Sequence, residues 1–282
     1  MEQLATGYGL IEGPVWDPRR GLLFSDVENG GVYCLSPAGA ITTVVEHRRG
    51  IGGMALHADG GLVVSGRNVA YKPPGGATTV VLLDRDASIV GFNDLTTDTR
   101  GRVYVGSLGV SPFDASAHES ARTGWLHVID VDGSSRRLAD GITLSNGLGF
   151  SPDGKRLYHS DSRAGIVGVY DVAADGTVGP RRTFARLDSG VPDGLVVSVD
   201  GAVWIAAAYG GAVVVFDADG KERERIACSL PMVTSVCFGG DDLRDLYVVT
   251  GSRNGPSENC GSIFRTRVEV PGLPLHPARV NG

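Results

Sequence analysis

The stretch that decides the fold reads Asn146-Gly147-Leu148-Gly149-Phe150-Ser151-Pro152-Asp153. It places a polar residue before a few apolar residues and ends in a turn. The same pattern occurs six times when the copies are aligned on the turn, at intervals of 40, 41, 53, 47 and 41 residues. Four strands and their turns occupy about 40–50 residues in one blade of a β-propeller. The six copies begin at Glu12, Gly52, Asn93, Asn146, Asp193 and Thr234.

Each copy is followed by further strand-like runs that complete a four-stranded unit. Val103-Tyr104-Val105 and Val203-Trp204-Ile205 are rich in the β-branched and aromatic residues that favour strands. Asp219-Gly220 separates two later runs, and Asp-Gly between apolar runs is a strong hairpin signal. No amphipathic helix of three turns stands out, which argues against a parallel α/β fold. We therefore predict an all-β, six-bladed β-propeller that forms a single domain over residues 1–282.

The two ends of the chain carry strand-like residues that need partners. A closed propeller removes exposed sheet edges by radial repetition. We therefore expect the segment before Glu12 to pair with the last blade around Ser262-Ile263-Phe264.

Composition excludes several classes of function. The hydrophobic content of 42% is enough for a substantial core, and the net charge of −6 comes without any basic cluster interleaved with aromatic residues. A nucleic-acid partner is therefore not expected. No apolar stretch approaches the ~20 residues of a membrane span, and the first nine residues do not resemble a signal peptide. We expect a cytoplasmic protein that does not bind membranes, and the sequence does not indicate an oligomeric state.

The residues that open the six copies have a chemistry in common. Each precedes the innermost strand of its blade, so the six should ring one mouth of the central tunnel. Five of them carry or can present an oxygen ligand, and two are carboxylates, Glu12 and Asp193. Two carboxylates in a partly desolvated tunnel repel each other unless a cation lies between them. We predict a central metal site that consists of Glu12, Asn146 and Asp193.

The donor types also indicate which metal binds. Oxygen ligands without Cys or His favour calcium, magnesium or manganese over structural zinc. We expect one divalent cation and rank calcium first, with zinc, manganese and magnesium as alternatives. Taken singly, Asn146 and Asp193 before glycine are ordinary turn residues, and Glu12 before Gly13-Pro14 is compatible with a surface bend. Asn93 is compatible with a metal ligand, a substrate-binding residue or a turn residue.

The longest repeat interval contains an insertion. Residues 109–124 are small and polar, and they follow a strand that should end near the mouth of the tunnel. Such a segment is typical of a lid over a pocket, although a surface insertion is the alternative. His118 and Glu119 lie in it, and neither is assigned to the site.

Six short motifs accompany the repeat: Glu12-Gly13-Pro14-Val15-Trp16, Phe92-Asn93-Asp94, Ser145-Asn146-Gly147-Leu148, Tyr158 with Asp161-Ser162, Pro192-Asp193-Gly194, and Thr234-Ser235-Val236-Cys237-Phe238-Gly239-Gly240. Together they resemble the motifs of the senescence-marker-protein/gluconolactonase/luciferin-regenerating-enzyme family. The resemblance extends from about Glu12 to Phe264 and implies a six-bladed propeller and a divalent-metal-dependent lactone hydrolase. It places the metal ligands on Glu12, Asn146 and Asp193 and a substrate-binding role on Asn93.

Two positions depart from the family pattern. Sugar-lactone hydrolases of the family have an arginine two residues before the asparagine of the second motif, where this chain has Gly91. Some also have an acid near the start of the lid, where Ser111 stands here. Both departures predict a smaller or more apolar lactone or ester rather than a sugar lactone.

The expected reaction is the opening of a lactone ring by metal-activated water. The cation would polarise the carbonyl, and Asp193 would act as the general base for the attacking water. Direct attack by the carboxylate remains an alternative for the nucleophile. For the function as a whole, a metal-dependent esterase or phosphotriesterase-like hydrolase and a non-enzymatic, metal-stabilised binding scaffold remain alternatives.

Overall fold

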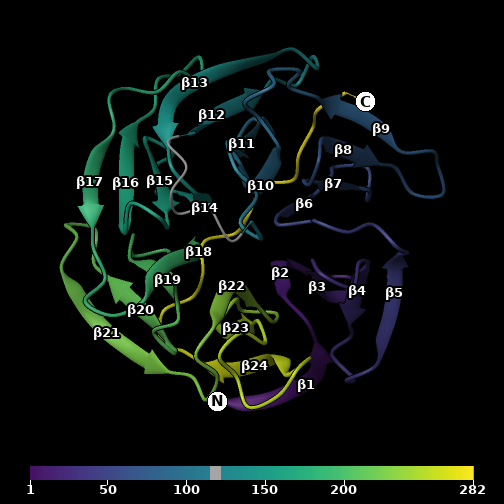
Figure 1. Cartoon of the computed structure of the whole chain (residues 1–282), viewed down its shortest axis with the longest axis vertical. Coiled ribbons are helices and arrows are strands. Elements are labelled where there is room, and N and C mark those ends of the chain that lie inside the picture. The colour runs from purple at the N-terminus through teal and green to yellow at the C-terminus, as the bar shows by residue number, and fades with distance from the viewer. Residues whose placement is uncertain (115–121, 282) are drawn as a thin grey trace. The chain divides into compact units, whose positions relative to one another are not determined.

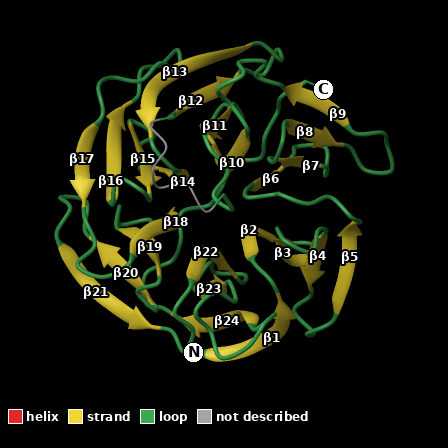
Figure 2. Cartoon of the chain, viewed as in Figure 1, coloured by secondary structure: helices red, strands yellow, loops and turns green. Residues whose placement is uncertain are grey.

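The computed structural model describes residues 1–114 and 122–281. Within these residues the regular structure consists of 24 strands, and Figure 2 draws strands and loops without a helix. The strands form six four-stranded antiparallel sheets. The predicted all-β class and the six blades are therefore confirmed.

Backbone contacts divide the chain into two compact units. The first comprises Met1–Ile51 and Ala185–Pro274. Its three sheets are β2 (Ile11–Asp17), β3 (Gly21–Asp26), β4 (Val32–Leu35) and β5 (Ile41–Val45); β18 (Val191–Val197), β19 (Val203–Ala208), β20 (Ala212–Phe216) and β21 (Glu222–Ala227); and β22 (Val233–Gly239), β23 (Asp245–Thr250), β24 (Gly261–Arg267) and β1 (Glu2–Tyr8).

The second unit comprises Gly52–Phe184 and the chain from Leu275 onward. Its three sheets are β6 (Met54–Leu56), β7 (Leu62–Val64), β8 (Val69–Lys72) and β9 (Thr79–Leu82); β10 (Gly91–Thr97), β11 (Val103–Leu108), β12 (Gly124–Ile129) and β13 (Ser135–Ile142); and β14 (Ser145–Phe150), β15 (Arg156–Asp161), β16 (Ile166–Asp171) and β17 (Arg182–Ala185), which ends at the unit boundary. The predicted single domain over residues 1–282 stays a prediction.

Five of the six blades are up-and-down meanders of four consecutive strands. In Figure 1 the teal strands β10, β11, β12 and β13 follow one another across their sheet in chain order. Tight turns at glycine allow this order. Gly220, between β20 and β21, has φ of 82°, a left-handed conformation that a side chain disfavours. The Asp219-Gly220 hairpin predicted from the sequence is therefore confirmed.

One blade is completed by the first strand of the chain, which joins the last three strands. Strand β1 pairs with β24, with Gln3 opposite Phe264 and Thr6 opposite Ser262. This pairing is the one expected from the need to cover sheet edges, and it is confirmed. The strand before Glu12 is thus part of a sheet other than the one that contains β2.

Apolar side chains between neighbouring sheets form the core. In the first unit the Trp204 and Phe238 rings meet edge to face, with centroids 5.3 Å apart, and in the second unit Tyr104 and Phe150 do so at 5.0 Å. Such pairs contribute beyond the burial of their surface. None of the elements of residues 1–114 and 122–281 is a helix with the length and apolar character of a transmembrane span.

Candidate active site

The candidate site residues occupy a recurring irregularity of the innermost strands. Pairing with the second strand shifts between Phe92 and Leu95, between Ser145 and Leu148, and between Pro192 and Leu195. In β2 the shift follows Glu12 directly. A β-bulge of this kind re-aims side chains and is often found beside active sites. Asn93, Asn146 and Asp193 are each the first residue within the shift of their blade, whereas Glu12 is the last paired residue before it.

In the first unit the two candidate carboxylates lie on strands that flank β22. Both β2 and β18 pack against β22. Glu12 is 8% exposed and Asp193 is 6% exposed. The Thr234 hydroxyl of β22 donates to the backbone oxygen of Ile11 at 2.6 Å, which fixes the start of β2 next to Glu12. Burial of two carboxylates opposes their negative charge and therefore favours a bound cation.

In the second unit the two candidate amides are joined directly. Asn93 Nδ2 donates to Asn146 Oδ1 at 2.5 Å and to the Ser145 carbonyl oxygen at 2.8 Å. Asn146 Nδ2 donates in turn to the Ser162 hydroxyl at 2.7 Å. The amide nitrogen of Asn146 is thus engaged, so its oxygen is the atom suited to a cation. Asn146 is 7% exposed, whereas Asn93 is half-buried.

Asp94 is a candidate functional residue that the repeat alignment did not single out. It is buried, and burial raises the pKa of its carboxyl to about 7. The signal for it lies in the sequence, because the residue after the bulge position is Gly13, Gly147 or Gly194 in three other blades. A buried acid where the other blades have glycine indicates a function rather than a turn.

Asp161 positions the strand that carries Asn146. Its carboxylate accepts hydrogen bonds from the backbone nitrogens of Thr143 and Leu144 and from the Thr143 hydroxyl. Arg181 forms an ion pair with it at 3.0 Å. Burial of Asp161 opposes its charge, but these hydrogen bonds lower its pKa on balance. The loop that precedes Asn146 is therefore anchored by a charged residue that the sequence analysis had left out of the site.

A buried aspartate also accepts a backbone hydrogen bond at the end of the second strand in the first blade. Asp26 occupies the place in β3 that Asp161 has in β15, since Ile11 pairs with Asp26 and Ser145 pairs with Asp161. Its Oδ2 accepts a hydrogen bond from the backbone nitrogen of Gly9 at 3.1 Å, and Asn29 Nδ2 donates to the same oxygen at 2.8 Å. The approaches to Glu12 and Asn146 are thus both held by a buried aspartate.

A buried histidine completes the support beneath Asn146. His159 Nε2 lies 2.7 Å from the Ser145 hydroxyl. Burial lowers the pKa of His159 to about 4, so the imidazole is neutral at pH 7. Since the Ser145 carbonyl also accepts from Asn93, this histidine connects to both candidate amides.

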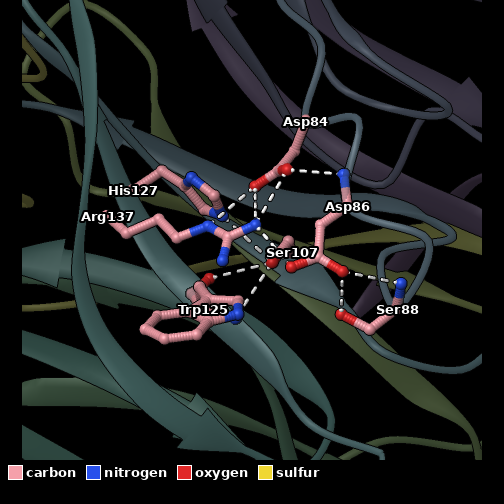
Figure 3. Close-up of polar contacts among 7 residues, drawn as sticks. All are labelled: Asp84, Asp86, Ser88, Ser107, Trp125, His127 and Arg137. Atoms are coloured by element: carbon pink, nitrogen blue, oxygen red, sulfur yellow. Dashed lines mark hydrogen bonds and ion pairs between the residues drawn. The ribbon is translucent and has the colours of Figure 1, made fainter.

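A second polar cluster supports the approach to Asn93, and Figure 3 shows its seven residues. Arg137 of β13 donates to Asp84 and Asp86 in the loop that leads into β10, and its guanidinium lies 4.6 Å from the centroid of the Trp125 ring. His127 Nε2 lies 3.1 Å from the Ser107 hydroxyl, but Ser107 is fully buried and out of reach of a substrate. This cluster therefore holds residues 84–86 in place and is not a serine-hydrolase centre.

The predicted site residues are divided between the two units. Asn93 and Asn146 contact each other in one unit, and Glu12 and Asp193 lie in the other. Within the described residues, three or more His, Cys, Asp or Glu side chains nowhere gather as a metal-binding group. The predicted set of two carboxylates and an amide is not such a group, so it stays a prediction. Of the predicted lid, residues 115–121, with His118 and Glu119, lie outside the described residues.

Six four-stranded antiparallel blades, several with a bulge beside a polar residue on the innermost strand, define the class of this protein as a six-bladed β-propeller. Residues 10–252 match the SMP-30/Gluconolactonase/LRE-like region, and the chain belongs to this family. It is 35% identical over 292 residues to pentonolactonase XacC of Haloferax volcanii, a match that covers 95% of this chain and 94% of the relative. It is 32% identical to 6-deoxy-6-sulfogluconolactonase of Pseudomonas putida, over 93% of this chain and 92% of the relative. Among solved structures, a luciferin-regenerating enzyme shares the fold with a TM-score of 0.88 at 23% identity and covers 99% of both chains.

Proposed function

We propose that this protein is a divalent-metal-dependent hydrolase that opens the ring of a lactone. The proposal is supported by the family and by two relatives that are named as lactonases and match along almost their whole length. The observation that carries it is the recurrence of buried oxygen donors at the bulges of three innermost strands, with Asn146 and Asp193 within the bulge and Glu12 directly before it. The two relatives do not favour an esterase of another kind or a binding scaffold.

The donor chemistry fits a hard cation. Glu12 and Asp193 supply carboxylate oxygens, and Asn146 supplies an amide oxygen whose own nitrogen is engaged by Ser162. Calcium accepts six to eight oxygen ligands in loose geometry, whereas structural zinc sites use Cys and His. We therefore propose calcium, bound by Glu12, Asn146 and Asp193. The cation, when bound, supplies Lewis-acid polarisation of the lactone carbonyl.

The side chains of this protein perform the remaining tasks. Asp193 is the proposed general base, which accepts the proton of the attacking water at its carboxylate. Asn93 presents its Oδ1 to the substrate because its Nδ2 is committed to Ser145 and Asn146. The hydrogen bonds that the Asn146 side chain makes hold its amide in one orientation. They therefore reduce the entropic cost of ordering the site when substrate binds.

A direct test combines turnover with metal binding. Protein treated with a chelator and then supplied with calcium should open lactones, and calcium binding should be measured independently by calorimetry. Asp193→Ala should lower kcat by about 10²–10⁴-fold while the protein keeps its circular dichroism spectrum. Asp188→Ala is the matched control, because Asp188 is an exposed acid five residues earlier in the chain. An Asp193→Ala protein that is folded and fully active would refute the role of Asp193, and a wild-type protein that opens no lactone would refute the proposal itself.

A further inference from the structure

One turn in each blade lies at the end of the sheet that carries the candidate site. The first residues of an innermost strand pair with the last residues of the second strand, as Phe92 does with Ser107 and Ser145 with Asp161. The turn that follows the second strand therefore lies beside the bulge. In the second unit two such turns, between β7 and β8 and between β15 and β16, consist of described residues throughout.

The turn between β7 and β8 is fastened to the strand that carries Asn93. Gly66 forms an isolated antiparallel bridge with Phe92, and the Phe92 backbone nitrogen donates to the Gly66 oxygen at 2.6 Å. A Cβ atom at Gly91 would lie 3.1 Å from that oxygen, tighter than side chains normally pack, and 3.8 Å from the Cα atom of Arg67. Gly91 thus lets the turn approach closely and brings the Arg67 backbone to a point two residues before Asn93.

The side chain of Arg67 is exposed and has no hydrogen bond or ion pair with another described residue. Three other arginines of this unit are engaged, since Arg102 pairs with Asp98, Arg137 with Asp84, and Arg181 with Asp161. A guanidinium carries five N–H donors in a rigid fork and suits a ligand with neighbouring oxygen atoms. The Arg67 guanidinium has no such partner, and its turn is held beside the bulge. It is therefore suited to ligand recognition rather than to stability.

We infer that Arg67 is a specificity-determining residue, which donates hydrogen bonds to ring hydroxyls and selects polyhydroxylated lactones over unsubstituted ones. This inference rests on the proposed lactonase function. It also replaces the expectation of a smaller or more apolar lactone or ester, which rested on the absence of an arginine at Gly91 and of an acid near Ser111. Arg67 belongs to the neighbouring blade, and its Cα atom lies 3.8 Å from the place that a Cβ atom at Gly91 would occupy.

Two lactones with the same ring test this inference. The wild-type protein and Arg67→Ala are assayed with a pentono-1,4-lactone, which carries hydroxyls, and with γ-butyrolactone, which carries none. We expect Arg67→Ala to reduce the preference for the hydroxylated lactone by about tenfold, through a raised KM rather than a lowered kcat. Arg100→Ala is the matched control, because the Arg100 side chain is exposed and has no hydrogen bond or ion pair with another described residue, but lies in the turn between β10 and β11, at the other end of the sheet. The control should leave the preference unchanged.

The outcomes separate the two proposals. A wild-type protein that opens neither lactone refutes the lactonase function, and the inference about Arg67 falls with it. A wild-type protein that opens γ-butyrolactone but not the hydroxylated lactone leaves the function standing and overturns the inference. The inference is also overturned if Arg67→Ala lowers kcat/KM equally for both lactones, or changes the preference no more than Arg100→Ala does.

Discussion

Asn93 donates through Nδ2 to Oδ1 of Asn146 at 2.5 Å, across two neighbouring innermost strands. The same nitrogen donates to the carbonyl oxygen of Ser145 at 2.8 Å. Because both hydrogens of this amide are used, its orientation is fixed and Oδ1 is the atom left for a ligand. The two residues therefore act as a unit, and a change that displaces Asn93 should also release Asn146.

A side chain at Gly52 should displace Asn93 without disturbing the fold. A Cβ atom at Gly52 would overlap Oδ1 of Asn93, the far end of a side chain that can rotate away. We expect Gly52→Ala to lower kcat/KM by about ten- to a hundredfold while it changes the free energy of unfolding by less than about 1 kcal/mol. Steady-state kinetics and urea unfolding of the same protein measure the two effects.

The neighbouring glycine provides the contrast. A Cβ atom at Gly53 would lie 2.7 Å from the backbone nitrogen of Leu95 and 2.8 Å from the Cα atom of Asp94, neither of which can rotate away. Gly53→Ala should therefore destabilise the protein by about 1–3 kcal/mol. Gly179→Ala, where the nearest atom is 3.8 Å away, controls for the substitution itself.

A fully active Gly52→Ala protein would contradict the first of these two predictions, because the position of Asn93 would then not depend on its close approach to Gly52.

The sequence predicted the blades because a propeller repeats one unit, and a period of about 40–50 residues is visible without coordinates. It also placed Asn93 and Asn146 at one repeat position, and the structure shows them in contact. The contribution of Asp161 was not predictable from the repeat. An aspartate at a strand end is a common turn residue, and only the positions of Thr143, Leu144 and Arg181 show that it holds the approach to Asn146.

The Asp161–Arg181 pair allows a test of positioning against stability. Asp161→Asn removes a buried charge that accepts several hydrogen bonds, so we expect it to lower the free energy of unfolding by about 3 kcal/mol or more. Asp171→Asn is the matched control, because Asp171 pairs with Arg182 at the surface and its side chain is 62% exposed. That exposed pair should contribute less than about 1 kcal/mol. Equal losses in the two variants would contradict the role assigned to Asp161.

Calcium removal tests whether the candidate ligands act together. A cation that binds the folded state alone stabilises it by about 2.7 kcal/mol when its concentration is a hundred times its Kd. We expect calcium to raise the melting temperature of chelator-treated protein by about 5–10 °C. Glu12→Gln and Asn146→Ala change one ligand in each unit, and both should abolish most of this rise. A variant that keeps the full calcium response would remove its residue from the predicted metal site.

Acid should lower the free energy of unfolding because two buried histidines become protonated when the protein unfolds. Burial lowers the pKa of both His127 and His159 from the usual 6.5 to about 4. The unfolded chain therefore binds more protons than the folded protein between pH 6.5 and pH 4, and stability falls as the pH drops through this range. Each histidine accounts for about 3 kcal/mol when the full shift is realised near pH 4. Urea unfolding at pH 7 and pH 5 measures the loss, which should be smaller in His159→Gln whatever the absolute stability of that variant. An identical loss in wild type and variant would mean that His159 takes up its proton without unfolding.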